Sequence, residues 1–171
     1  VQSLYFPAAQ GTDLASIPGY TLDPLARFFK HLFLASAIFV LVMAADFAKR
    51  LRTGISEFSS LVLFALAGMM CAASATTFVM LFVAIELITI TFYVLTSFQR
   101  HRERSLEAGV KYLILGAAAS AMMVYGIALI YGTTGSMEFT VLSQPTETYT
   151  GGQLQILSLG LLMLLAGLGL G

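Results

Sequence analysis

Long apolar stretches separated by short polar segments dominate the sequence. The first stretch extends from Phe28 to Phe47, and the second extends from Phe58 to Phe98 with Glu86 as its only charged residue. The second stretch is about twice as long as one membrane crossing, which takes about 20 apolar residues. It must therefore contain a turn, which we expect in the small and polar segment Ala73–Thr77. Because apolar and polar positions do not alternate, the pattern predicts membrane-spanning helices and not the strands of a membrane barrel.

The rest of the chain predicts two more helices. One begins at Ser105, where a serine is a favourable N-cap, and ends near Tyr131. A polar segment rich in glycine follows, and an apolar stretch then runs from Leu154 to Gly171. Prolines and glycines in residues 1–24 predict a loop there. The chain is therefore expected to be an all-α, polytopic transmembrane bundle of about five helices, the last one truncated, at residues 25–48, 58–75, 76–98, 105–131 and 153–171.

The basic residues predict how these helices are oriented in the membrane. They gather after the first and third predicted helices, at Lys49, Arg50, Arg52, Arg100, Arg102 and Arg104. Two crossings separate the two groups, so both groups lie on one side of the membrane. The positive-inside rule makes that side cytoplasmic, and residues 1–24 and the loop around Pro145 then face outward.

Composition agrees with a membrane protein. Hydrophobic residues make up 58% of the chain and charged residues 11%, whereas about a quarter of an ordinary soluble domain is charged. Nine basic and nine acidic residues cancel, so the charge indicates no nucleic-acid partner. The chain begins at Val1 and stops at Gly171 inside an apolar stretch. We therefore expect it to be an excerpt of a longer protein.

Glu86 is the first candidate for chemistry because it lies near the middle of the third predicted helix. An ionised carboxylate that faces lipid at this depth costs several kcal/mol, so the side chain must face a polar interior, find a partner or take up a proton. A carboxyl group in such a place is a candidate for proton transfer. The alternative is an uncharged glutamic acid that only forms a hydrogen bond with a neighbouring helix.

Lys111 is the second candidate, about 9 to 10 Å along the fourth predicted helix. Glu107 lies four residues earlier, so the two side chains share a helix face in the favourable order. The third and fourth helices should be antiparallel neighbours, which puts Glu86 and Lys111 roughly 8 Å apart along the membrane normal. A water or two would couple them across that gap. Alternatively, Glu107 and Lys111 form a structural pair, or Lys111 extends toward cytoplasmic water.

Other features of the sequence predict packing and no bound group. The small residues from Gly116 to Ala121 favour close approach of a neighbouring helix. No cluster of His, Cys or carboxylate side chains is spaced for a metal ion, a haem or an iron–sulfur centre. We therefore expect no metal site and no cofactor-binding site in this chain.

A resemblance to a known family rests on the segment SLEAGVKYLILGAAAS, which runs from Ser105 to Ser120, and on its continuation YGIALIYGTTGS, which runs from Tyr125 to Ser136. The segment closely resembles the subunit N family of bacterial respiratory complex I, the NADH:quinone oxidoreductase. The Glu86-Leu87 pair, the Gly68-Met69-Met70 segment and the start of the first helix, Asp23–Lys30, fit the same family. The resemblance covers residues 23–171, and the Glu86 motif alone is shared by all antiporter-like subunits.

The resemblance implies a translocase subunit that carries protons outward, driven by electron transfer from NADH to quinone elsewhere in the complex. Glu86 would be the mid-membrane carboxylate of the proton-translocating half-channel, and Lys111 with Glu107 would be a buried charged pair on the next helix. FMN and iron–sulfur clusters would lie in other subunits. The implied partners are antiporter-like and small membrane-arm subunits and lipid, and the implied location is the bacterial inner membrane.

The family continues beyond the point where this chain stops. After the residues that correspond to Leu168–Gly171, its members have a Phe-Lys and a Pro-Phe-His motif. We therefore expect that this chain alone does not translocate protons, and a proton-selective flux through the reconstituted chain would contradict that. Two other interpretations of the sequence remain open. One is a subunit of a cation/proton antiporter or a membrane-bound hydrogenase, and the other is a helix scaffold that transports nothing.

Overall fold

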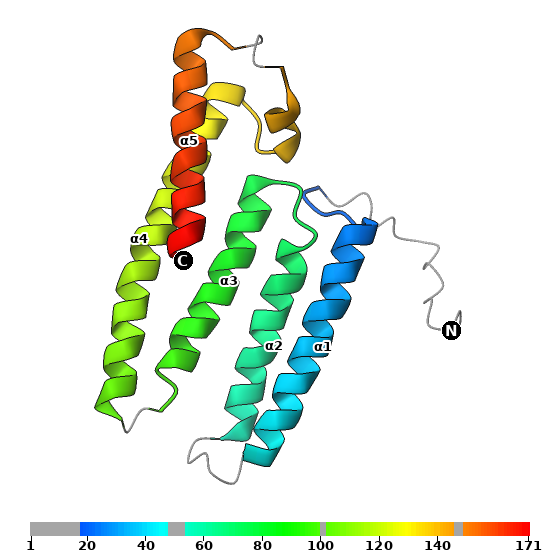
Figure 1. Cartoon of the computed structure of the whole chain (residues 1–171), viewed down its shortest axis with the longest axis vertical. Helices are drawn as coiled ribbons and strands as arrows, with labels where there is room; N and C mark the ends of the chain where they lie inside the picture. The colour runs from blue at the N-terminus through cyan, green and yellow to red at the C-terminus, as the bar shows by residue number, and fades with distance from the viewer. Residues whose placement is uncertain (1–17, 48–53, 100–101, 146–148) are drawn as a thin grey trace.

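The structure is a computed structural model that describes residues 18–47, 54–99, 102–145 and 149–171. The described part contains five α-helices and one short 3-10 helix (Figure 1): α1 Pro24–Phe47, α2 Ile55–Ala72, α3 Phe78–Thr96, α4 Glu103–Thr134, η4 Phe139–Ser143 and α5 Gly151–Leu170. All five α-helices are long and apolar enough to cross a membrane. The predicted all-α, membrane-spanning fold class is therefore confirmed.

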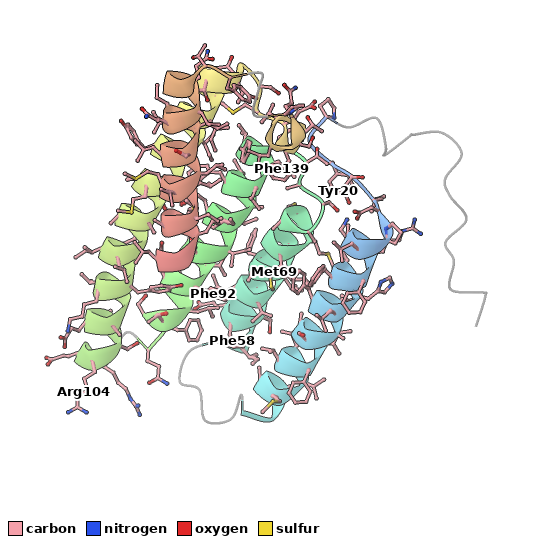
Figure 2. The ribbon with its side chains drawn as sticks, turned by 45° about the horizontal axis from the view of Figure 1, so that its top comes forward. Tyr20, Phe58, Met69, Phe92, Arg104 and Phe139 are labelled. Carbon is pink, nitrogen blue, oxygen red and sulfur yellow. The ribbon has the colours of Figure 1, made fainter. Side chains whose placement is uncertain are left out.

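The helices pack in chain order. Figure 1 shows α1, α2, α3 and α4 side by side, with α5 folded back along α4. Figure 2 shows Arg104 at one end of the bundle and Phe139 at the other, and we call these the Arg104 end and the Phe139 end. The end of α1 and the start of α2 lie at the Arg104 end, and so do the end of α3 and the start of α4, as the two crossings between them require.

Part of the orientation prediction lies outside the described residues. This holds for residues 1–17, and also for Lys49, Arg50, Arg52 and Arg100. Arg102 and Arg104 are described, and both lie where α4 begins. The assignment of the Arg104 end to the cytoplasm therefore stays a prediction.

The connection between α2 and α3 consists of residues 73–77, the segment that the apolar pattern predicts for the turn. Thr77 caps α3 by accepting a hydrogen bond from the Met80 backbone N–H. Two distant segments brace this turn: the Thr21 N–H donates to the Ser74 carbonyl at 2.8 Å, and the Phe139 N–H donates to the Thr76 carbonyl at 3.0 Å. The α2–α3 turn is thus fixed to the α4–α5 connection at the Phe139 end.

Helix α4 is longer than the pattern predicts, since it begins before Ser105 and ends after Tyr131. The prediction that Ser105 is the N-cap is wrong, because Arg102 occupies that position. The Ser105 hydroxyl instead donates to the Thr96 carbonyl at 2.8 Å, which satisfies one of the carbonyls that the end of α3 leaves free. At its other end α4 terminates at Gly135, whose φ of 71° is the left-handed conformation that favours glycine.

Glycines set how closely α4 approaches its neighbours. On the side of α3, a Cβ atom at Gly109 would lie 2.7 Å from the Ser97 Cβ. On the side of α5, a Cβ atom at Gly126 would lie 2.6 Å from the carbonyl oxygen of Gly160. The backbones therefore meet at the α4–α5 seam, whereas at the α3–α4 seam Gly109 makes room for the Ser97 side chain. Small residues allow such close approach of membrane helices.

Candidate functional site

Glu86 lies near the middle of α3 and faces α4. Its Oε1 accepts a hydrogen bond of 2.5 Å from the Ser120 hydroxyl, and the contact is partly buried. The apolar surroundings of α3 leave a carboxyl group few partners, so a neighbouring hydroxyl is the means by which it is held inside the bundle. The structural alternative for Glu86 predicts a hydrogen bond of this kind with a neighbouring helix, and a proton carrier at this depth is compatible with it, because it too needs a polar partner or interior.

Ser120 belongs to the site, although the sequence analysis assigns it only to helix packing. It is the one hydroxyl residue in the small-residue segment from Gly116 to Ala121. Its hydroxyl also faces the Gly116 carbonyl at 3.0 Å, one turn earlier on α4. A lone hydroxyl inside a packing stripe, on the helix that follows a membrane carboxylate, is the signal that would have identified it.

Two tyrosines lie next to the site on the side of the Arg104 end. The Tyr93 hydroxyl occupies the space where Gly116 lacks a side chain. The rings of Tyr93 and Tyr112 meet edge to face with their centroids 4.9 Å apart, a favourable arrangement for aromatic pairs. Gly116 thus serves the site twice, since its carbonyl faces Ser120 and its missing Cβ admits Tyr93 against α4.

Glu107 and Lys111 form the ion pair that their spacing predicts. The distance from Lys111 Nζ to Glu107 Oε1 is 2.5 Å, and the side chains are 75% and 62% exposed, respectively. The five helices of this chain therefore do not form the buried charged pair that the resemblance implies. An exposed ion pair of this kind is worth little, about 0 to 1 kcal/mol.

The structure corrects the predicted distance between Glu86 and Lys111. Glu86 is level with Ser120, which follows Lys111 by nine residues, or about 13 Å along the helix and not 8 Å. Nine residues are also about two and a half turns, so Lys111 and Ser120 lie on opposite faces of α4. The prediction that a water or two couples Glu86 to Lys111 is therefore wrong for this chain.

The physical reason is the way in which α4 packs on α3. It is Gly109, well inside α4, that packs against Ser97 just after the end of α3. The first turns of α4 consequently extend beyond α3 at the Arg104 end, which Figure 1 shows. Lys111, two residues further along α4 than Gly109, is nearly level with the last turn of α3.

Comparisons with known proteins agree on one family. A protein-family model described as "NADH:quinone oxidoreductase/Mrp antiporter, TM" matches residues 75–170, which include Glu86, Glu107, Lys111 and Ser120. The chain is 42% identical to NADH-quinone oxidoreductase subunit N of Desulfitobacterium hafniense over 162 residues, which are 93% of this chain and 32% of that protein. The chain therefore spans about a third of the length of this curated relative.

Two solved structures share the fold. One is respiratory complex I from Thermus thermophilus with bound aureothin, with a TM-score of 0.70 and 34% identity over 90% of this chain and 32% of the matched chain. The other is the membrane-bound sulfane sulfur reductase, an archaeal respiratory membrane complex, with a TM-score of 0.73 and 27% identity. That match covers 85% of this chain and 28% of the other.

Proposed function

The chain belongs to the NADH:quinone oxidoreductase/Mrp antiporter transmembrane family, and from this membership we propose that it is part of subunit N of a bacterial NADH:quinone oxidoreductase. Like the family, it is a multi-pass membrane protein. The complete subunit carries protons outward across the membrane, and the electron transfer from NADH to quinone that drives it takes place in other subunits. The enzyme is thus a translocase to which this chain contributes membrane helices.

The observation that carries the proposal is the position of Glu86. The carboxyl group lies near the middle of a membrane-spanning helix and accepts a hydrogen bond from the adjacent helix, inside the bundle. A carboxyl group held at this depth is costly to keep, and membrane proteins retain such groups chiefly in ion and proton pathways. In the proposal Glu86 takes up a proton from one side and releases it to the other.

The proposal also assigns partners and cofactors. The complete subunit packs against other antiporter-like and small membrane-arm subunits and against lipid, in the bacterial inner membrane. FMN and iron–sulfur clusters carry the electrons in other subunits, and this chain holds no redox centre. Both similar solved structures are respiratory membrane complexes, which supports a role within an assembly.

A second candidate function is a cation/proton antiporter subunit, because the matching family model includes the Mrp antiporters by its description. A membrane-bound hydrogenase subunit belongs to the same group of candidates, and a helix scaffold is the third. NADH-driven pumping that requires quinone supports the oxidoreductase. Exchange of protons for another cation, without dependence on NADH or quinone, supports the antiporter.

Glu86→Gln in the complete subunit tests the role of the carboxyl group. Proton pumping and NADH:quinone electron transfer are measured in membranes in which a native gel verifies assembly of the complex. A scaffold tolerates this exchange, because glutamine has nearly the same shape and still accepts a hydrogen bond. A proton path does not tolerate it, because the amide does not carry a proton.

Lys111 and Glu107 enter the proposal as a charged pair at the Arg104 end of the path. Replacing Lys111 by methionine is expected to lower proton pumping by no more than about fivefold, because an exposed pair contributes 0 to 1 kcal/mol. The same pumping assay on the assembled complex checks this, with Glu107→Gln as the matched variant that breaks the pair from its other side. A loss of well over fivefold in either variant would contradict this expectation, and unchanged pumping in both variants would make the pair structural.

A further inference from the structure

Ser120 offers one hydroxyl hydrogen to two acceptors. Its oxygen lies 2.5 Å from the Glu86 carboxyl oxygen and 3.0 Å from the Gly116 carbonyl oxygen. A serine hydroxyl has one hydrogen to donate and two lone pairs to accept with. It therefore donates chiefly to one of these two oxygens at a time.

We propose that Ser120 is a positioning residue for Glu86, whose hydroxyl turns between the Glu86 carboxylate and the Gly116 carbonyl as Glu86 loses and gains a proton. This rests on the proposed role of Glu86 as a proton carrier. Ser120 itself exchanges no proton. It keeps the carboxyl group in place, facing α4, in both of its protonation states.

The two states follow from the contacts. When Glu86 is ionised, the Ser120 hydroxyl donates to the Glu86 oxygen. When a proton binds that oxygen, the new carboxyl O–H donates to the Ser120 oxygen, and the serine hydrogen rotates to the Gly116 carbonyl. That carbonyl has a second lone pair beside the one used in the helix. No serine bond breaks, and the proton later leaves from the oxygen that it bound.

This arrangement removes a free-energy cost. A carboxyl group in an apolar interior otherwise loses its hydrogen-bond partner when its protonation changes. A buried polar group that loses its partner costs about 1 to 3 kcal/mol. With Ser120, each protonation state of Glu86 has a hydrogen-bond partner, so neither state is penalised for lack of one. Among the described residues, Ser120 is the one side chain that bonds to the Glu86 carboxyl oxygens. The charged side chains of Glu107 and Lys111 are exposed, and Lys111 lies on the face of α4 opposite to that of Ser120.

The test uses the complete subunit in its assembled complex, with Ser120→Ala, which removes the hydroxyl, and Ser120→Thr, which retains it. Ser36→Ala is the control, because the Ser36 hydroxyl bonds only to a carbonyl one turn earlier, that of Leu32. NADH-driven pumping is one measurement. The other is the infrared carbonyl band of protonated Glu86, identified as the band that Glu86→Gln removes.

We expect Ser120→Ala to lower pumping by about tenfold, the effect of losing one hydrogen bond to a charged group. The Glu86 carbonyl band should move, because the carboxyl O–H has lost its acceptor. Ser120→Thr should restore both the pumping rate and the band position. Ser36→Ala should change neither.

An unmoved band in Ser120→Ala overturns the proposal, and so does pumping at the wild-type rate while Glu86→Gln abolishes it. The band depends on the hydrogen bond and not on pumping. If the band moves in Ser120→Ala but the Glu86→Gln complex pumps normally, the hydrogen bond between Ser120 and Glu86 is retained as a contact. That result would refute the proton-carrying role of Glu86 and the switch that rests on it. If Ser120→Ala does not assemble, Ser120→Cys replaces it with the same criteria, because a thiol has similar size but is a weak donor.

Discussion

Glu86→Gln should reduce proton pumping by about 100-fold or more, the contribution that a positioned proton-transfer group makes. The amide oxygen still accepts the hydrogen bond of the Ser120 hydroxyl, so the contact between α3 and α4 is retained and the complex should assemble. What is lost is the ability to hold and release a proton in the middle of α3. NADH:quinone electron transfer should fall together with pumping, because the two processes are coupled in the proposed enzyme.

The matched control is Glu138→Gln. Glu138 lies at the Phe139 end, just before η4, and its exposed carboxylate accepts a hydrogen bond from the Thr140 hydroxyl at 3.1 Å. Removing the charge there should leave pumping and electron transfer near wild-type rates in the same membranes. If instead both activities persist in Glu86→Gln, the carboxyl group is structural, and Lys111 becomes the residue to test for the proton path.

Gly126→Ala, at the seam between α4 and α5, should lower the thermal stability of the complex. A Cβ atom there would lie 2.6 Å from both the Gly160 carbonyl oxygen and the Leu164 backbone nitrogen. Both are backbone atoms, so no side-chain rotation relieves the clash, and α5 must move away from α4. Overpacking of this kind costs about 1 to 3 kcal/mol, and replacing a helical glycine by alanine gains about 1 kcal/mol, so we expect a net loss of stability of up to about 2 kcal/mol.

Thermal stability of the solubilised complex, followed by native gel, checks this prediction. Gly132→Ala is the control on the same helix, because a Cβ atom at Gly132 meets nothing within 4 Å. That variant should be as stable as the wild type or slightly more stable. Equal stability of Gly126→Ala and Gly132→Ala would show that the α4–α5 seam is not held by backbone contact.

The positions of the helices follow from the sequence by local physics. A bilayer demands about 20 apolar residues for each crossing, so the stretch from Phe58 to Phe98 must form two helices. The small and polar segment Ala73–Thr77 is where its turn is least costly. Glu86 stands out for a similar reason, since a carboxyl group in the middle of such a stretch is expensive wherever it faces lipid. The spacing of Glu107 and Lys111 likewise predicts their ion pair, because residues four apart meet on a helix.

The relation between α3 and α4 is decided by packing between the helices. Apolar pattern and loop length predict that the two helices are antiparallel neighbours, but they leave the sliding of one helix along the other undetermined. Gly109 and Gly116 on α4 make room for Ser97, just after the end of α3, and for Tyr93 of α3, and these contacts fix the register. That register puts Ser120 opposite Glu86. Lys111, nine residues earlier on α4, is then about 13 Å away along the helix and on its other face.

The sequence by itself thus determined that the chain crosses a membrane, how many helices cross it, and which carboxyl group the proposed function depends on. Each of these follows from the cost of placing a given residue in lipid. Only the tertiary structure decided which hydroxyl holds Glu86. That choice depends on how α3 and α4 pack, because the absence of side chains at Gly109 and Gly116 makes room for Ser97 and Tyr93 in the register in which Ser120 reaches the carboxyl group.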